Sequence, residues 1–292
     1  MLTIAAADPV NYFRAIILGI VQGLTEFIPI SSSAHIRITA AIAGWDDPGA
    51  AFTAVTQIGT ELAVVLYFRN DILHILRAWF RSLPARRWPE DPDARMGWLI
   101  IIGTLPVAIL GLALQNPIDD AFRDLRLTAF MLIVFGLLLG WADANHRSDK
   151  PIESLTVRDG LIYGFAQALA LIPGTSRSGA TITAGRILGY SREAATRYAF
   201  LLALPAVFAS GLFELKDIGS GPGKDSVAWG PTILATVIAF FIGLAVIAWL
   251  MKYLRTRSYA PFVAYRVALG IFLIILITAG GLDPNAAQAI TK

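Results

Sequence analysis

The sequence has no cysteine and few charged residues. Without cysteine, a disulfide framework, a thiolate metal site and a cysteine nucleophile are all excluded. Charged residues make up 15% of the 292 residues and hydrophobic residues 56%, so a water-soluble domain is not expected. No long basic run accompanies the net charge of +3, so we expect no binding to nucleic acid. Residues 1–11 lack a basic region and a small-residue cleavage site, so no removable signal peptide is expected.

Long apolar segments are what the sequence has in quantity. Six of them are close to the roughly 20 residues that a helix needs to cross a bilayer. They are 50–68, 96–114, 125–142, 193–215, 229–250 and 265–282. All seven tryptophans fall at the ends of expected segments or in the links, as in an aromatic belt at the membrane surface. The sequence therefore predicts an all-α polytopic membrane protein, formed as a single membrane domain over residues 1–292.

Two further apolar segments, 12–43 and 158–190, are interrupted by proline and by polar side chains. The first contains Gln22, Glu26 and a run of three serines, which make it too polar at its centre for a helix that faces lipid. In a bilayer, irregular backbone is tolerated only where protein or a water-filled cavity surrounds it. Each segment is therefore predicted to form a re-entrant hairpin of helix, break and helix, which enters and leaves the membrane on the same side.

The break in the second segment is a polar decapeptide, residues 172–181, with one arginine and four hydroxyl groups. Pro173 and Gly174 favour the break, and the helix that restarts after them has backbone N–H groups without a partner in the helix. Together with the guanidinium of Arg177, such a helix start favours phosphate oxygens. The alternative is a structural kink whose arginine reaches a lipid headgroup. The flanking hydroxyls and the cost of an intramembrane charge favour an anion site.

The two interrupted segments resemble each other. Gly19 to Gln22 aligns with Gly164 to Gln167, and Ile28 to Ser32 aligns with Ile172 to Ser176 after a one-residue gap. The chain is therefore interpreted as a duplication, with repeat one at about 12–142 and repeat two at about 158–282. Because each repeat has three spans, the second must be inverted in the membrane relative to the first. An inverted repeat would bring both breaks to one site near the midplane.

The basic residues indicate the orientation. The links at 69–95, 143–160 and 251–266 carry most of them and are predicted to be cytoplasmic, whereas 115–126 and 216–227 are predicted to lie outside. Both termini would then be outside, with the first hairpin entering from outside and the second from the cytoplasm. Part of the first link, Asp71 to Leu83, has apolar residues on one helical face and is predicted to lie along the membrane surface.

The first segment brings together residue types that serve phosphoryl transfer. Gln22 and Glu26 are spaced to share a helical face, and Ser32 and His35 are spaced likewise just beyond the break. Glu26 can hold a divalent cation or act as a base, Ser32 can attack phosphorus, and His35 can move the proton. Attack by water or by His35 itself stays open. A buried imidazole bonded to a carbonyl is the simpler interpretation of His35 alone, but beside Glu26 the catalytic interpretation is favoured.

Two motifs carry a family resemblance: Gln22-Gly-Leu-Thr-Glu26 followed by Phe-Ile-Pro-Ile-Ser-Ser-Ser-Ala-His35, and Pro173-Gly-Thr-Ser-Arg-Ser-Gly-Ala-Thr181. They resemble the two signatures of the bacterial undecaprenyl-diphosphate phosphatases of the bacitracin-resistance type, and the likeness covers nearly the whole chain. The resemblance implies hydrolysis of undecaprenyl diphosphate to the monophosphate and inorganic phosphate, which recycles the lipid carrier of cell-wall synthesis. It also implies a divalent cation, Mg²⁺ or Ca²⁺, a multi-pass position in the bacterial plasma membrane, and a site accessible from the outer side.

The first signature matches Glu26, Ser31, Ser32 and His35, and the second matches Ser176, Arg177, Ser178 and Thr181. We expect catalytic roles for Glu26, Ser32, His35 and Arg177, cation binding by Glu26, and substrate contacts from Gln22, Ser31, Ser176, Arg177, Ser178 and Thr181. Gln22 departs from the family, in which many members have a glutamate; an amide can bind phosphate or coordinate weakly, but it cannot act as a base. Glu61, in the middle of the first span, is a candidate substitute, and a structural pairing with a hydroxyl or an arginine is the equal alternative.

The main alternative function is a transporter or flippase of a polyprenyl phosphate or another anion, because inverted repeats with broken helices are a transporter architecture. A structural scaffold would leave the buried charges unexplained. A hydroxyl, an imidazole and a carboxylate together exceed what binding alone requires, which favours the enzyme. The expected partners are a polyprenyl diphosphate lipid and membrane lipids. The oligomeric state stays open, with a homodimer as one alternative.

Overall fold

Residues 10–85, 88–113, 124–145, 149–218 and 228–286 are described by the structure, which is a computed structural model. The regular secondary structure in these ranges is helical, and the one β-type bridge among them joins Lys150 to Tyr190. The α-helices are α1 (Tyr12–Thr25), α2 (Ser32–Ala43), α3 (Gly49–Tyr67), α4 (Arg69–Ser82), α5 (Pro92–Ala113), α7 (Leu125–Asn145), α8 (Val157–Ala168), α9 (Arg177–Ile187), α10 (Arg192–Glu214), α11 (Trp229–Leu254) and α12 (Ala260–Thr278). Short 3₁₀ helices are η1 (Leu83–Ala85), η2 (Ile152–Ser154), η3 (Leu169–Leu171) and η4 (Leu215–Asp217).

Six helices in the described ranges, α3, α5, α7, α10, α11 and α12, are long and apolar enough to cross a membrane. They lie over the six segments expected from the sequence, which confirms an all-α, multi-pass membrane protein. The clearest shift is in α12, which begins at Ala260 rather than at 265. Pro261 occupies its first turn, where the fixed φ of proline suits a helix start and the missing N–H costs no helical hydrogen bond.

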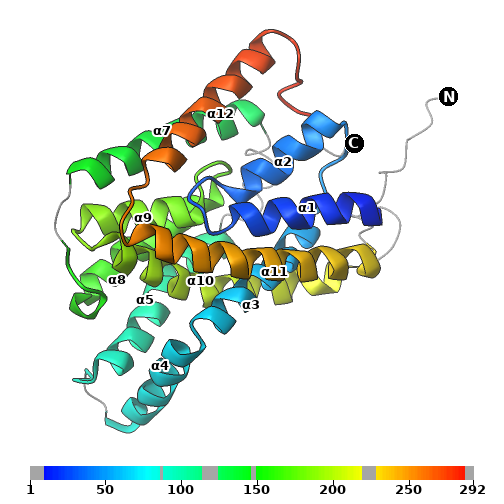
Figure 1. Ribbon diagram of the computed structural model, residues 1–292. Helices are drawn as coiled ribbons and strands as arrows, with labels where there is room; N and C mark the ends of the chain where they lie inside the picture. The colour runs from blue at the N-terminus through cyan, green and yellow to red at the C-terminus, as the bar shows by residue number, and fades with distance from the viewer. Residues whose placement is uncertain (1–9, 86–87, 114–123, 146–148, 219–227, 287–292) are drawn as a thin grey trace.

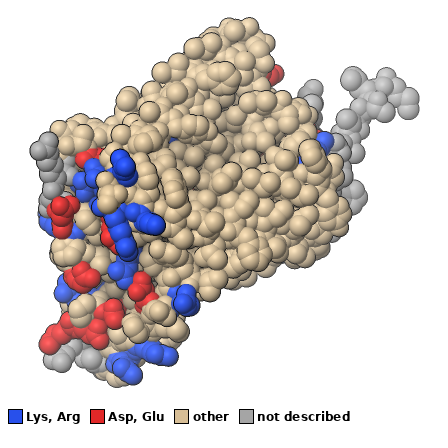
Figure 2. All heavy atoms as spheres, in the orientation of Figure 1, with Lys and Arg blue, Asp and Glu red and all other residues tan. Residues whose placement is uncertain are grey.

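Helix α4 is amphipathic and follows α3 directly. Its Trp79 packs against Gly97 of α5, while Leu73, Leu76 and Phe80 stay exposed. Figure 2 shows charged side chains gathered mainly at the end of the molecule where α4 lies in Figure 1, beside a broad uncharged face. A charged end next to an uncharged face is typical of a protein embedded in a bilayer. The location of α4 along the membrane surface stays a prediction.

Both interrupted segments form two helices separated by a break. Helix α1 ends at Thr25, and α2 starts after Ser31, whose hydroxyl accepts a hydrogen bond from the amide of Ala34. Helix α8 runs into η3, and α9 starts after Ser176, whose hydroxyl accepts a hydrogen bond from the amide of Gly179. Among the described residues, these serines are the only ones besides glycines with a positive φ, 74° and 71°. The two breaks therefore share one local structure.

The matched serines correct the alignment of the two segments. Ser31 and Ser176 are separated by the same interval as Gly19 and Gly164, so the one-residue gap is wrong. The gap had matched the prolines of the two breaks. The structure instead makes the serines that start the next helices equivalent, because both have the same backbone conformation and the same capping bond.

The two halves of the chain also pack alike. Helix α1 lies against α11 with Gly19 at the backbone of Ala235, and α8 lies against α5 with Gly164 at the backbone of Gly103. A side chain at either glycine would overlap the facing backbone, so these contacts require the glycines. Helix α3 packs on α10, and α7 packs on α12 (Figure 1). Each interrupted segment is thus held by a helix from the other half.

The largest buried apolar cluster is built around α10. Phe27, in the first break, belongs to it and packs edge-on against Phe200 of α10, with ring centroids 5.3 Å apart. Aromatic pairs of this geometry contribute about 1 kcal/mol beyond the burial of their surface. The residue next to Glu26 is therefore anchored in the core, which fixes the first break against α10.

Candidate active site

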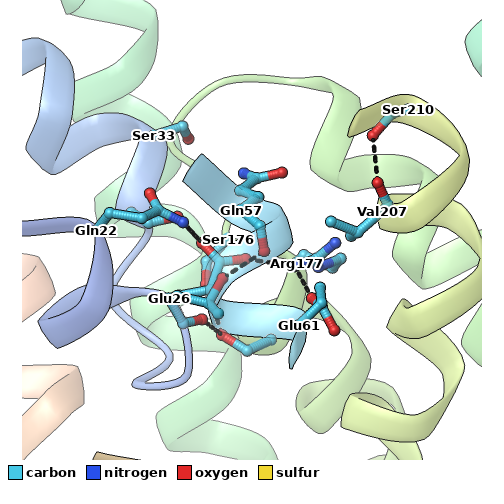
Figure 3. A network of polar contacts seen from close by, with 12 residues as sticks. Gln22, Glu26, Ser33, Gln57, Glu61, Ser176, Arg177, Val207 and Ser210 are labelled. Carbon is cyan, nitrogen blue, oxygen red and sulfur yellow. Dashed lines mark hydrogen bonds and ion pairs between the residues drawn. The ribbon is translucent and has the colours of Figure 1, made fainter. Parts of the chain in front are cut away.

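Residues from three helices converge where the two breaks meet (Figure 3). Arg177 is the first residue of α9, Glu26 follows the last residue of α1, and Glu61 lies within α3. Nη2 of Arg177 donates to Oε1 of Glu26 and, at 2.9 Å, to Oε1 of Glu61. The acid side chains are 4% and 1% exposed and the arginine side chain 19%, so the three groups meet almost out of water. The structure thus joins the two signatures through Glu26 and Arg177 and adds Glu61 to them.

Glu26 is also the acceptor for two polar side chains of its own signature. Nε2 of Gln22 donates to Oε2 of Glu26 at 2.8 Å, and Oγ of Ser32 donates to the same oxygen at 2.5 Å. Gln22 lies one helical turn before Glu26, and the break returns the chain so that Ser32 faces the carboxylate. A hydroxyl that donates to a carboxylate is placed to lose its proton to it. The pair has the geometry of a nucleophile and its base.

The other hydroxyls of the two signatures mainly shape the breaks. In each break two of them face each other at 3.2 Å, Ser31 with Ser33 and Ser176 with Ser178. Oγ of Ser178 also lies 3.4 Å from the carbonyl oxygen of Glu26, so it links the second break to the first. Thr181 is fully buried and donates to the carbonyl of Arg177 at 2.8 Å. These bonds are to the protein itself, and the substrate contacts expected for these residues stay predictions.

Both ring nitrogens of His35 lie within hydrogen-bonding distance of an oxygen atom. Nδ1 lies 2.7 Å from the carbonyl oxygen of Ser31, and Nε2 lies 2.7 Å from the hydroxyl of Tyr265, whose ring stacks on the imidazole. Because a carbonyl only accepts, Nδ1 carries the hydrogen, and Nε2 of the neutral ring accepts from the tyrosine. The hydroxyl of Ser32 donates to Glu26, and no hydrogen bond joins it to His35. A role for His35 in moving the proton stays a prediction.

A cavity of about 610 Å³ opens beside these residues. Glu26, Ser32 and Arg177 form part of its polar wall, and residues of α5 and α10 such as Val107 and Pro205 form its apolar walls. Pockets of this size and composition hold ligands whose few polar groups fix the orientation while apolar contacts bury the rest. The arrangement suits an amphiphile with an anionic headgroup and a hydrocarbon tail.

The described residues contain no group of three or more His, Asp or Glu side chains placed to hold a metal ion. The buried oxygen atoms that lack a hydrogen-bond partner within the described chain nevertheless include Oε1 of Gln22 and Oε2 of Glu61. Gln22 contacts Glu26, and Glu61 shares Arg177 with it. Oxygen atoms of this kind are the ligands that Mg²⁺ and Ca²⁺ prefer. The donor set around Glu26 therefore fits a divalent cation.

Sequence reasoning missed two residues near the start of α12. Tyr265 contacts His35, and Arg266 is fully buried with hydrogen bonds to backbone carbonyls of both breaks. The bounds predicted from the sequence place both residues where the link 251–266 meets the last span, 265–282. Since α12 begins at Ala260, they lie inside the helix, and an arginine inside an apolar span would have been the signal.

The chain matches the family model described as "Bacitracin resistance protein BacA" over residues 15–272. It is 61% identical over 289 residues to undecaprenyl-diphosphatase 2 of Frankia casuarinae, with 94% of this chain and 98% of the relative covered. It is 58% identical over 291 residues to undecaprenyl-diphosphatase 2 of Streptomyces coelicolor, with 96% and 99% covered. It is 59% identical over 272 residues to undecaprenyl-diphosphatase of Micrococcus luteus, with 92% and 98% covered. The match includes both breaks and most of α12, and the chain belongs to the BacA family of bacitracin resistance proteins.

Proposed function

We propose that this protein is an integral membrane phosphatase that hydrolyses undecaprenyl diphosphate to undecaprenyl phosphate and inorganic phosphate, and so recycles the lipid carrier of cell-wall synthesis. The observation that carries the proposal is the placement of Glu26, Ser32 and Arg177 on one wall of a cavity whose other walls are largely apolar. The names of the relatives, undecaprenyl-diphosphatase, indicate the same substrate. The apolar helices around the cavity would hold the prenyl chain within the membrane.

In the proposed reaction, Oγ of Ser32 attacks the terminal phosphorus, and its proton passes to Glu26. The bond between that phosphorus and the bridging oxygen breaks, and undecaprenyl phosphate leaves with the bridging oxygen. Water then attacks the phosphoserine, which releases inorganic phosphate and restores the hydroxyl. His35 is the proton carrier expected from the sequence, and attack by water or by His35 itself are the alternatives.

Arg177 would bind the diphosphate and stabilise the charge that develops on the leaving monophosphate. A guanidinium has five N–H donors, and both acids contact it through Nη2. Phosphate oxygens would accept hydrogen bonds from the other N–H groups of the guanidinium, and they would compete with the two carboxylates for Nη2. The start of α9, at which Arg177 stands, would add backbone N–H groups and the helix dipole.

We expect Glu26 to hold the divalent cation, with Oε1 of Gln22 and Oε2 of Glu61 as further ligands, because these atoms are buried and unpaired within the described chain. A cation there would offset negative charge on the diphosphate. Gln22 itself would orient Glu26 through the hydrogen bond from its amide nitrogen. Arg177 would then supply one fixed positive charge near the headgroup, and the cation held by Glu26 would supply a second, exchangeable one.

The inverted arrangement of the two repeats and the outward-facing site belong to the same proposal. The shared conformation of the two breaks and the exchange of packing partners between the halves support two re-entrant hairpins related by inversion. The cavity is lined by α5 near Leu112 and by α10 near Phe213, the ends that lead to the links at 115–126 and 216–227. Because those links have few basic residues, the cavity would open to the outer side.

Phosphate release by the purified protein in detergent tests the proposal. We expect release from a prenyl diphosphate, inhibition by a chelator, and recovery with Mg²⁺ or Ca²⁺. Detergent micelles have no second compartment, so release cannot come from transport. A protein that binds the prenyl diphosphate but releases no phosphate with either cation would overturn the phosphatase and favour the transporter or flippase.

A further inference from the structure

Arg266 joins the two breaks through backbone carbonyl groups. Its Nη1 donates to the carbonyl of Pro29 at 3.0 Å, and its Nη2 donates to the carbonyls of Gly174 and Thr175, both at 2.9 Å. Nε donates to the carbonyl of Leu132 in α7 at 3.2 Å. One side chain from α12 therefore binds acceptors in the first break, in the second break and in a neighbouring span.

The surroundings of this guanidinium are unusual for a charged group. The residue is 0% exposed, and no carboxylate in the described part of the chain forms an ion pair with it. Removing a charge from water without an opposite charge is costly. The carbonyl groups can offset this cost because a broken helix leaves carbonyls without helical partners. An arginine retained at this cost inside a membrane segment indicates a function.

Two glycines leave the space that Arg266 occupies. A Cβ at Gly179 would lie 2.5 Å from Nη1 of Arg266, and a Cβ at Gly136 would lie 3.2 Å from its Cβ. Gly179 belongs to the first turn of α9, and its amide donates to the hydroxyl of Ser176. The guanidinium is therefore in direct contact with the start of the helix that carries Arg177.

We propose that Arg266 is a positioning residue for the hydrolysis, which fixes the two breaks relative to each other and so places Ser32 opposite Arg177. The inference rests on the proposed function of those two residues. The carbonyl groups that Arg266 binds lie in the turns immediately before Ser32 and Arg177, so a shift of either turn displaces a reacting side chain. Misplacement of about 1 Å can lower a rate by about a hundredfold.

The test compares Arg266 with a matched residue, Arg186. Arg186 is also buried and also donates to a backbone carbonyl, that of Tyr190, but it lies at the far end of α9 and pairs with Asp143. Lysine and methionine are introduced at each position, so that one variant keeps the charge and the other keeps only the approximate length. The purified full-length proteins are assayed for kcat and KM with farnesyl diphosphate, and their unfolding temperatures are measured.

Arg266→Lys should lower kcat by about 10- to 100-fold and change KM by less than about threefold, because the binding groups stay present but lose their alignment. Arg186→Lys should lower the unfolding temperature at least as much as Arg266→Lys does. Its kcat should nevertheless stay within about twofold of the wild type. A wild-type kcat in Arg266→Lys would overturn the positioning role. The positioning role would also be overturned if kcat fell in proportion to the loss of unfolding temperature in the same way at both positions.

Amide hydrogen exchange gives a readout that does not depend on hydrolysis. Substitution of Arg266 should speed exchange in residues 26–34 and 172–180 together, whereas substitution of Arg186 should speed it only around 186–190. If Arg266→Met does not fold, Gly179→Ala crowds Nη1 without removing it and should affect both breaks. Faster exchange in only one break, or in neither, would contradict the inference. No phosphate release by the wild type would instead overturn the proposed function, and the exchange pattern would still decide whether Arg266 joins the breaks.

Discussion

Glu26 and Glu61 approach the same atom, Nη2 of Arg177, from two different helices. One guanidinium thus faces two carboxylates in a site that is almost closed to water. A diphosphate that binds there must compete with both acids for Nη2, because phosphate oxygens and carboxylates use the same donors. The strength of this competition can be changed by substitution without altering Arg177 itself.

Glu61→Gln should tighten binding of the diphosphate, because the amide keeps the size of the side chain and removes one competing charge. We expect the dissociation constant of a non-hydrolysable prenyl bisphosphonate to fall by about 3- to 10-fold, which corresponds to about 1 kcal/mol. The isotherm is measured for wild type and variant, each with Mg²⁺ and with chelator. The full gain is expected with chelator and a smaller gain with Mg²⁺, because the variant also weakens Glu61 as the cation ligand that we propose. An equal gain under both conditions would contradict that role of Glu61, and weaker binding with chelator would contradict the competition for Nη2.

Ser32→Ala should remove the attacking atom and lower turnover at least about 1,000-fold, with binding of the bisphosphonate largely kept. Thr183→Val is the matched control, since Thr183 is a buried hydroxyl that donates to a backbone carbonyl in α9, that of Gly179. Its turnover should stay within about threefold of the wild type. Single-turnover rates of the Ser32→Ala and Thr183→Val proteins show whether turnover depends on the hydroxyl of Ser32. Turnover near wild type in Ser32→Ala would transfer the attack to water or to His35.

The sequence was enough to locate the candidate site because charge inside a hydrophobic segment is costly. Glu26 and Arg177 stand out against apolar neighbours, and the six spans follow from length and composition. What could not be predicted is which groups pair, since Arg177 and Glu61 belong to helices that meet only through tertiary packing. The pairing with Glu61 therefore appeared in the sequence only as one of two alternatives.

Arg266 shows a different limit. Its helix begins earlier than hydropathy alone indicates, because Ser258 and Tyr259 stand just before Ala260 and Pro261 and make the start of α12 resemble a link. A residue at an apparent boundary is usually assigned to solvent or to the headgroups, so a buried arginine there is overlooked. The alignment error between the breaks had a similar origin. The alignment predicted from the sequence matches the prolines of the two breaks, whereas in the structure a serine with positive φ is the equivalent residue.

Ser176→Gly should destabilise the protein less than Ser176→Ala. Both lose the hydroxyl that caps α9, which costs about 1 kcal/mol in the alanine variant and a few tenths of that in the glycine variant. Only alanine keeps a side chain at φ 71°, a sparsely populated conformation that costs about 1–3 kcal/mol, whereas glycine adopts it freely. The unfolding midpoint in detergent should therefore be higher for the glycine variant than for the alanine variant. An alanine variant more stable than the glycine variant would contradict the strain at this position.

The expected orientation can be tested by labelling, because the sequence has no cysteine and an introduced cysteine is its only thiol. Glu90 and Lys216 are exposed and lie in links of opposite basic content. With a membrane-impermeant maleimide, Lys216→Cys should be labelled in intact cells, and Glu90→Cys only after permeabilisation. The reverse pattern would invert the orientation and place the cavity toward the cytoplasm.

Gln22→Glu tests how the site tolerates a third carboxylate. Nε2 of Gln22 now donates to Oε2 of Glu26, whereas a glutamate would place a like charge there and lose the donor. We expect Gln22→Glu to retain turnover at millimolar Mg²⁺ and to need less cation for half-maximal activity than wild type, since a carboxylate binds a divalent cation more tightly than an amide oxygen does. Glu26→Gln should lower kcat by about 100-fold or more at every cation concentration, because it removes the base and the main ligand. Phosphate release is titrated against Mg²⁺ and Ca²⁺ for wild type and both variants. If Glu26→Gln hydrolysed the substrate normally while Gln22→Glu showed an unchanged cation requirement, Glu26 would be neither base nor ligand. The search for both roles would then move to Glu61, the other carboxylate that Arg177 contacts.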